Sequence, residues 1–497
     1  MQIHAWWALL VAVAVVLSKH CCALLHAGSL LVQASDLGSD YPSTTSLCGE
    51  NLTKETGTLN DLYYVYYESS VKRAQGAKIP VILWLSGGPG CSGLVALLFE
   101  NGPCSFDDEA NQISLNPYSW TALAHVIYVD QPKGTGFSDP DSGITPPWTL
   151  QHTAVDLRHF LELFFDQHHD LRRNDFYIFG ESFAGHYIPG LATELIESVD
   201  DGRSLPKLKG VGIGNGLVST MSWADSVIPF ATSNNYVADL LGLHEADIQN
   251  TLDRFKAAMA SCKEQQMTES TVARLYRELN FENASDACAE AAWELAALEG
   301  KASAAVWDSL GRNVYDLRRL CHVNDPVQLC YRFSRLEDFV NTAGARAYFN
   351  EVHHEWKLCT PSSFQQLAEM DKLAESEGDV ARALEQGVRV LIYGGDADTV
   401  VNWQAQDAWT RGLVWSNGVA FRSTAFVEYE FEGRRIGRVR TANGLSFMKV
   451  YNAGHVRFPA MNTLMLENAR KYMPEMYLVF WMIYRWCHMI SQRQRSR

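Results

Sequence analysis

A six-residue segment between a predicted strand and a predicted helix constrains this fold most. Residues 180–185 read Gly-Glu-Ser-Phe-Ala-Gly. The apolar run 176–179 before them predicts a buried strand, and residues 186–199 after them predict a helix. A Gly-x-Ser-x-Gly turn in this context holds its serine on a sharp bend where larger flanking side chains would collide. The motif predicts Ser182 as a nucleophile; a glycine-rich turn with an incidental serine is the alternative.

Strands and helices alternate on both sides of this turn. Further strands are predicted at residues 62–67, 80–85, 125–130, 208–215, 388–393 and 446–451. A helix is predicted at 153–165, and this alternation indicates an α/β fold with a mostly parallel, doubly wound sheet. The loop 86–91 is glycine-rich but lacks the Gly-Lys-Ser/Thr of a phosphate loop, so it offers mainly backbone N–H groups.

The sequence also predicts a division of the chain into parts. Residues from about 220 to 345 are rich in helix formers and include an alanine-rich amphipathic run at 286–299, which predicts an inserted helical cap. We therefore expect a secretory signal segment at 1–34, the sheet domain with its cap at 35–475, and an apolar and basic tail at 476–497.

An acidic residue and a histidine follow two of the later strands. Asp396 and Asp398 lie after the strand at 388–393, and His455 lies after the strand at 446–451. Serine, acid and histidine thus occur in the chain order of the α/β-hydrolases. We favour Asp398 over Asp396 because it lies farther out on its loop, where it can reach an imidazole.

The amino terminus indicates entry into the secretory pathway. The apolar run 5–17 is short for a membrane span, and a cleavage-like triplet follows at 32–34; an uncleaved anchor is the alternative. Asn51 and Asn283 begin glycosylation sequons. Outside this segment and the tail lie eight cysteines: Cys48, Cys91, Cys104, Cys262, Cys288, Cys321, Cys330 and Cys359. An even number in an oxidising compartment favours disulfides over a metal site.

The tail bears on membrane association, and the net charge bears on nucleic-acid binding. Residues 476–490 are apolar but interrupted by Arg485 and His488, so we favour a helix on the core or at a membrane interface over a spanning anchor. Arginines within 492–497 keep the anchor as the alternative. The net charge of −15 argues against a nucleic-acid partner.

Four long motifs resemble those of the serine carboxypeptidases. They lie at residues 84–92, 130–138, 180–189 and 214–216, and the similarity continues through 311–316, 395–398, 402–403 and 453–455. The resemblance covers the chain from about 57 to 473. It implies an α/β-hydrolase that is lysosomal, vacuolar or secreted and that removes single residues from peptide C-termini at acid pH.

The chemistry of this family assigns roles to the matching residues. Ser182 is expected to attack the scissile carbonyl, with His455 taking its proton and Asp398 holding the imidazole. The backbone N–H groups of Gly88 and Phe183 are expected to form the oxyanion hole.

A second set of residues matches the network with which this family binds the terminal carboxylate of a peptide. Trp84, Ser86, Glu100 and Glu181 correspond to that network, in which the two glutamates share a proton. Ser86 stands where the family usually has asparagine, which predicts a looser hold on the carboxylate.

Lys133 and residues 456–458 are further departures from the family near the expected site, and they bear on leaving-group preference. His159 and Glu162 have a spacing found in zinc carboxypeptidases, but they lie on a predicted helix without a partner histidine. We therefore expect no metal and no cofactor.

The same comparison implies the disulfide pairing. Cys321–Cys330 and Cys91–Cys359 resemble bridges of the family, Cys262–Cys288 follows as the remaining cap pair, and Cys48 and Cys104 are left over. Two other functions stay open: an acyltransferase or esterase that uses the same serine, and a protective partner of another lysosomal enzyme.

Overall fold

The computed structural model describes most of the region between residues 47 and 455. The described residues are 47–48, 52–70, 78–107, 111–116, 119–138, 149–198, 205–234, 244–268, 287–321, 330–351, 353–359, 371–431 and 433–455. The chain divides into residues 1–42 and residues 43–497, and every described residue belongs to the second part. The expected signal segment, both glycosylation asparagines, residues 456–458 and the tail lie outside the described residues.

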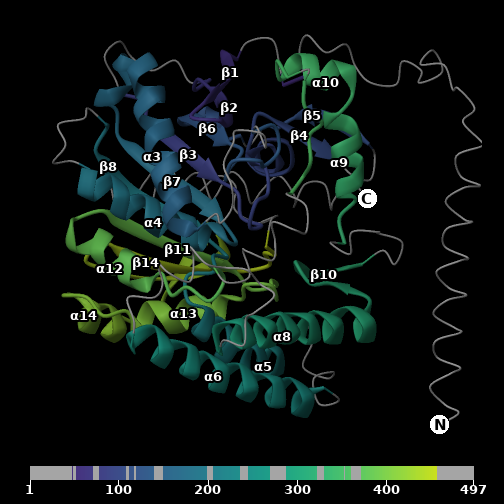
Figure 1. The fold of residues 1–497 in the computed structure, drawn as a ribbon, viewed down its shortest axis with the longest axis vertical. Helices are drawn as coiled ribbons and strands as arrows, with labels where there is room; N and C mark the ends of the chain where they lie inside the picture. The colour runs from purple at the N-terminus through teal and green to yellow at the C-terminus, as the bar shows by residue number, and fades with distance from the viewer. Residues whose placement is uncertain are drawn as a thin grey trace, which may run out of the picture. The chain divides into compact units, whose positions relative to one another are not determined.

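The fold is built on one large sheet (Figure 1). Within the described residues its order is β1 (Lys54–Leu59), β2 (Leu62–Tyr67), β6 (His125–Val129), β3 (Val81–Leu85), β7 (Phe176–Glu181), β8 (Leu208–Gly214), β11 (Arg389–Gly395), β14 (Leu445–Val450), β13 (Arg434–Ala442) and β12 (Val427–Phe431). Pairing is parallel from β6 through β14 and antiparallel at both ends. The mostly parallel sheet is therefore confirmed.

The strands that sequence patterns did not predict are mainly at the sheet edges. β1 reads Lys-Glu-Thr-Gly-Thr-Leu, and β12 and β13 carry alternating charged residues. An edge strand with one solvated face has no continuous apolar run to mark it. Two small hairpins were also not predicted, β4 (Cys104–Asp107) with β5 (Gln112–Leu115) and β9 (Arg312–Asn313) with β10 (Asp316–Leu320), because strands this short carry little periodic pattern.

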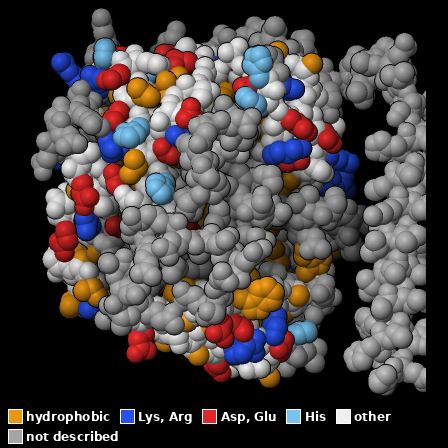
Figure 2. Space-filling view, viewed as in Figure 1, with side chains coloured by type: hydrophobic (Ala, Val, Ile, Leu, Met, Phe, Trp, Pro, Cys, Tyr) orange, Lys and Arg blue, Asp and Glu red, His pale blue; other side chains and the backbone are white. Residues whose placement is uncertain are grey.

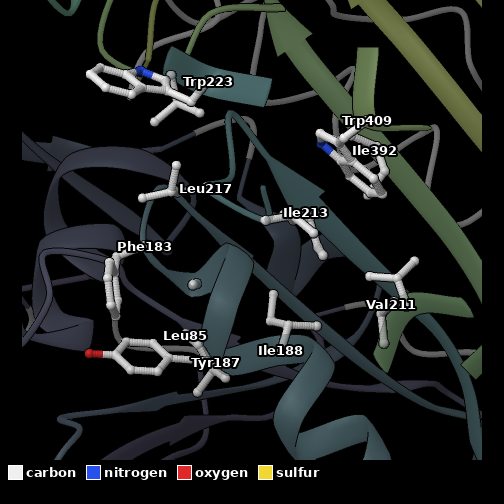
Figure 3. Close-up of a cluster of buried hydrophobic side chains, with 14 of the residues drawn as sticks. Leu85, Phe183, Tyr187, Ile188, Val211, Ile213, Leu217, Trp223, Ile392 and Trp409 are labelled. Atoms are coloured by element: carbon white, nitrogen blue, oxygen red, sulfur yellow. The ribbon is translucent and has the colours of Figure 1, made fainter. Parts of the chain in front are cut away.

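Two apolar layers enclose the central strands. One layer contains the buried faces of α3 (Leu150–Gln167), α4 (Ala184–Glu197), α12 (Glu377–Glu385), α13 (Trp403–Gly412) and α14 (Gly418–Ser423). Part of it is drawn in Figure 3, where Phe183 and Tyr187 lie side by side with ring centroids 5.1 Å apart. The other layer contains α2 (Gly93–Val95), η2 (Ala96–Glu100), α9 (Phe333–Val340) and α10 (Ala343–Tyr348). Alternate residues of β3 enter the two layers, as a central strand requires.

A group of helices follows β8. It consists of α5 (Thr220–Ser233), α6 (Glu245–Thr268) and α8 (Ala287–Leu310), and Figure 1 shows α6 and α8 side by side. Where these helices meet the loop after β11, a cavity of about 30 Å³ is lined mainly by apolar residues, among them Val227, Ile248 and Ala305. α9 and α10 follow these helices in the chain but pack in the second apolar layer of the sheet.

Four disulfides join described residues: Cys48–Cys104, Cys91–Cys359, Cys262–Cys288 and Cys321–Cys330. These are the pairs that the resemblance and the remaining cysteines implied. Among the described helices, none combines the length and apolar character needed to cross a membrane. On the face seen in Figure 2, acidic and basic side chains of described residues are intermixed.

Candidate active site

Ser182 lies on the turn between β7 and α4. Its φ of 59° is in the left-handed region, which non-glycine residues rarely adopt. Its N–H donates to the carbonyl of Gly214 at 3.0 Å, and its own carbonyl accepts from the N–H groups of Gly185 and Leu217, each at 2.9 Å. These three backbone hydrogen bonds hold the serine in its strained conformation.

The glycines on either side of Ser182 are required by close backbone approach. A Cβ on Gly180 would lie 2.2 Å from the carbonyl oxygen of Leu85, and a Cβ on Gly185 would lie 2.5 Å from that of Leu217. Neither position can carry a side chain unless the backbone moves. The Gly-x-Ser-x-Gly spacing therefore reflects the packing of the turn between β3 and the loop that follows β8.

The glycine-rich loop after β3 lies against this turn. A Cβ on Gly87 would come within 2.6 Å of the backbone nitrogen of Phe183 and 2.7 Å of the Cβ of Ser182. Gly88 has a φ of 114°, which favours glycine. The backbone N–H groups of Gly88 and Phe183 have no acceptor within the described part of the chain. They are therefore available to a group bound beside Ser182.

Asp398 and His455 form a buried hydrogen-bonded pair. His455 Nδ1 lies 2.7 Å from Asp398 Oδ2, and the two residues are 2% and 0% exposed. The N–H of Val400 donates to Oδ1 at 2.8 Å, and the N–H of Val401 donates to Oδ2 at 3.2 Å. Asp396 instead accepts from the N–H of Ala453, so of the two acids it is Asp398 that contacts the imidazole.

The environment of His455 favours its charged form. Burial lowers its pKa, but the charge of Asp398, their hydrogen bond and the charge of Glu181 together raise the pKa above its ordinary value. Glu181 directly precedes Ser182, so its effect on His455 shows that the turn carrying Ser182 and the loop carrying His455 are close enough to interact electrostatically. An imidazole with Nδ1 held by a carboxylate presents Nε2 as its other basic atom.

The hairpin of β9 and β10 is hydrogen-bonded to the loop after β11, which carries Asp398, and to the loop after β14, which carries His455. The carbonyl of Tyr315 accepts from the N–H of His455 at 2.7 Å, and the N–H of Leu317 donates to the carbonyl of Ala397 at 2.9 Å. The Tyr315 ring lies 5.3 Å from the His455 ring. Sequence comparison identified 311–316 as a motif but gave it no role, because its contacts are made through the backbone.

Glu100 and Glu181 come together from separate elements. Glu100 ends η2 and Glu181 ends β7, and they are 1% and 5% exposed. Burial raises the pKa of Glu181 well above its usual range, and the charge of Glu100 and a hydrogen bond between the two carboxyls raise it further. Two adjacent buried carboxyls disfavour the state in which both are charged.

Trp84 and Ser86 adjoin this region from β3 and its following loop. Trp84 is fully buried and packs edge-on against Trp120 with ring centroids 5.1 Å apart. The carbonyl of Ser86 accepts from Gln131 Nε2 at 3.1 Å. The buried Ser86 hydroxyl has no partner among the described residues, so it remains available to a ligand.

Lys133 is engaged within the protein. Its Nζ lies 3.3 Å from Asp61 and 3.2 Å from Asp156, and its side chain is only 6% exposed. The expectation that this lysine influences the leaving group finds no support in this geometry. The ion pair instead ties the loop 131–138 to the β1–β2 turn and to α3.

No group of three or more potential metal-ligating side chains occurs in the part of the chain that the structure describes. Within the zinc-like pair on α3, both His159 and Glu162 contact Arg158. This arrangement is an ordinary polar network on a helix surface.

Comparison with known proteins agrees with this geometry. The family model described as serine carboxypeptidase matches residues 50–468. The chain is 31% identical to "Serine carboxypeptidase-like 48" of Arabidopsis thaliana over 80% of this chain and 71% of that protein. It is 32% identical to a vacuolar serine-type carboxypeptidase of Saccharomyces cerevisiae over 79% and 73% of the two chains.

The fold is also found in a solved structure. The crystal structure of a prohormone-processing carboxypeptidase from Saccharomyces cerevisiae matches with a TM-score of 0.61 and 23% identity, covering 80% of this chain and 83% of the other. This likeness concerns the α/β-hydrolase fold. The family model covers most of the chain, so the protein belongs to the serine carboxypeptidase family.

Proposed function

We propose that this protein is a serine-type carboxypeptidase that releases single residues from peptide C-termini at acid pH. The observation that carries the proposal is the buried pair of Glu100 and Glu181 directly beside Ser182. A protonated carboxyl there can donate a hydrogen bond to a terminal carboxylate. A serine esterase without exopeptidase specificity has no need of such a pair.

The reaction follows from the roles of the three central residues. Ser182 Oγ attacks the carbonyl carbon of the last peptide bond, and His455 takes the hydroxyl proton at Nε2 because Nδ1 donates to Asp398. The N–H groups of Gly88 and Phe183 stabilise the oxyanion. When the intermediate collapses, the C–N bond breaks and His455 returns the proton to the departing amine. Water then attacks the acyl-enzyme with His455 as base, which releases the shortened peptide.

Two opposing titrations set the pH dependence. His455 must be neutral to act as base, so activity falls below its pKa. The charge of Glu181 helps to raise that pKa, and at acid pH the protonated glutamate pair no longer supplies this charge, which extends the neutral form of His455 to lower pH. The glutamate pair must hold its proton to bind a carboxylate, so activity falls again as that proton is lost at higher pH. The raised pKa of Glu181 moves this upper limit above that of an ordinary carboxyl group.

The test compares a blocked dipeptide acid with the corresponding amide from pH 4 to 8. We expect the acid to be favoured at low pH and the amide to peak at higher pH, because an amide supplies its own N–H to an ionised carboxylate. Superimposable profiles would contradict the proposal. Product formed by transfer to an added alcohol rather than to water would favour the acyltransferase reading.

Two variants complete the test. Ser182→Ala should lower kcat by a factor of about 10⁶, as is typical of a serine nucleophile. Glu181→Gln keeps a neutral donor at every pH, so it should flatten the alkaline decline for the acid substrate. Ser86→Asn should lower KM for acids with little effect on amides, since the added amide group donates to the carboxylate.

We further propose that the protein passes through the secretory pathway to an acidic compartment or is secreted. Four disulfides support this route, and a relative named above is vacuolar. Peptide mapping of the mature protein should find cleavage near residue 34 and glycans on Asn51 and Asn283. An intact amino terminus on unglycosylated protein would contradict it.

A further inference from the structure

We propose that Asn215 is a positioning residue that orients Asp398 toward His455 and links it to the turn that carries Ser182. The inference rests on the proposed catalytic role of these three residues. Asn215 does not touch the substrate in this scheme, so its action passes through the carboxylate of Asp398.

Asn215 lies at the end of β8, between the two loops that it joins. It is completely buried and has a φ of 38°, a conformation that asparagine tolerates better than most residues. Its Nδ2 donates to Asp398 Oδ2 at 2.7 Å and to the carbonyl of Val401 at 3.1 Å. Its Oδ1 accepts from the N–H of Gly395 at 3.2 Å. Every polar atom of the side chain is therefore used.

The hydrogen-bond partners determine which way the amide faces. The N–H of Gly395 can only donate, so it must meet the amide oxygen. The carbonyl of Val401 can only accept, so it must meet the NH₂ group. Asp398 Oδ2 therefore accepts an N–H from Asn215.

The contact is made at the oxygen that matters for catalysis. Asp398 Oδ2 accepts both from Asn215 and from His455 Nδ1, each at 2.7 Å. Rotation of the carboxylate would break both hydrogen bonds together. Asn215 thus restricts Asp398 to the orientation in which it holds the imidazole.

The same short segment also holds the nucleophile. The carbonyl of Gly214 accepts from the N–H of Ser182, and the next residue along the chain is Asn215. The end of β8 therefore connects serine and acid through two adjacent residues. A small displacement of such a connection costs much activity, since a misplacement of about 1 Å can lower a rate about 10²-fold.

Labelling of Ser182 by a phosphonofluoridate tests the inference without a peptide substrate. The reaction needs the activated serine but not C-terminal recognition, so it separates this proposal from the carboxypeptidase assignment. Asn215→Gly removes the side chain and accepts the positive φ. We expect labelling to slow about 10²-fold. On dipeptides, kcat should fall while KM stays within about twofold, as expected for an interaction that does not bind the substrate.

Asn215→Asp gives a second, independent readout. It keeps the shape of the side chain but sets a second buried carboxyl against Asp398, so the two carboxyls hold a proton between them. This proton withdraws charge from the oxygen that faces His455, so the imidazolium is less stabilised and the pH midpoint for labelling should move downward. Asn402→Ala is the matched control, because Asn402 is also buried and caps α13 but bonds to Ser226 rather than to Asp398. It should lower thermal stability and leave the labelling rate and its midpoint unchanged.

The outcomes distinguish a role of Asn215 in orienting Asp398 from a role in stabilising the fold. Slow labelling by Asn215→Gly with a lowered midpoint in Asn215→Asp supports the proposal. Wild-type labelling rates and an unmoved midpoint in both variants overturn it, even if both proteins melt at lower temperature. If the wild-type protein labels but does not cleave peptides, the carboxypeptidase assignment fails while these comparisons still decide the role of Asn215.

Discussion

Replacement of Lys133 by methionine separates two interpretations of this residue. As a departure from the family near the site, it was expected to influence the leaving group. In the structure its ammonium contacts Asp61 and Asp156. Methionine retains the apolar stem and removes the charge. We expect Lys133→Met to destabilise the protein without changing its substrate preference.

The magnitude follows from the burial of the three groups. Removing one partner of a fully buried ion pair costs about 3–5 kcal/mol. Here the Asp156 and Asp61 side chains are 20% and 49% exposed, so water solvates part of the charge left behind. We therefore expect a loss of about 2 kcal/mol, which for a chain of this size lowers Tm by about 2 °C.

Thermal unfolding and a substrate series together test this reasoning. The series varies the last residue among acidic, basic and apolar side chains, and the ratios of kcat/KM should match those of the wild-type protein. Lys357→Met is the control, because Lys357 pairs with Glu355 on the surface and should change stability by less than about 0.5 kcal/mol. An unchanged Tm with a tenfold shift in preference for acidic leaving residues would refute the structural role.

Three further changes probe the fold around the site. Gly185→Ala should slow labelling of Ser182 and lower Tm, because its Cβ would lie 2.5 Å from the carbonyl oxygen of Leu217; normal labelling and Tm would contradict this packing. Ile248→Ala should cost about 3 kcal/mol in urea unfolding, since it enlarges an existing cavity between α5, α6, α8 and the loop after β11; a loss below about 1 kcal/mol would show that the cavity collapses. Burial raises the pKa of Glu375 from 4.5 to about 7, so the folded state holds a proton that the unfolded state releases. Its stabilisation is thus present below pH 4.5 and lost as pH rises to 7, and Glu375→Gln should weaken the fall in unfolding free energy over that range; identical slopes would exclude this carboxyl as the source.

The sequence by itself predicted that the three proposed catalytic residues follow central strands of the sheet. Ser182, Asp398 and His455 each follow a buried strand, and the carboxyl ends of parallel strands meet at one edge of a sheet. The glycines around Ser182 were readable because a tight turn leaves no room for Cβ atoms, which is a local requirement. Polar edge strands gave no such signal, since half of each lies in water.

Only the tertiary structure decided which distant groups serve these residues. Asn215 and Asp398 are 183 positions apart, and no local pattern shows that an amide at the end of one strand faces a carboxylate after another. The carbonyl of Tyr315 reaches His455 through the backbone, which leaves no mark in residue type. Lys133 was expected to bear on leaving-group preference, but in the folded chain its ammonium pairs with Asp61 and Asp156. Hydrogen bonds and ion pairs between segments far apart in the sequence form only where the tertiary structure brings those segments together. Their positions are set by the packing of strands and helices across the whole sheet.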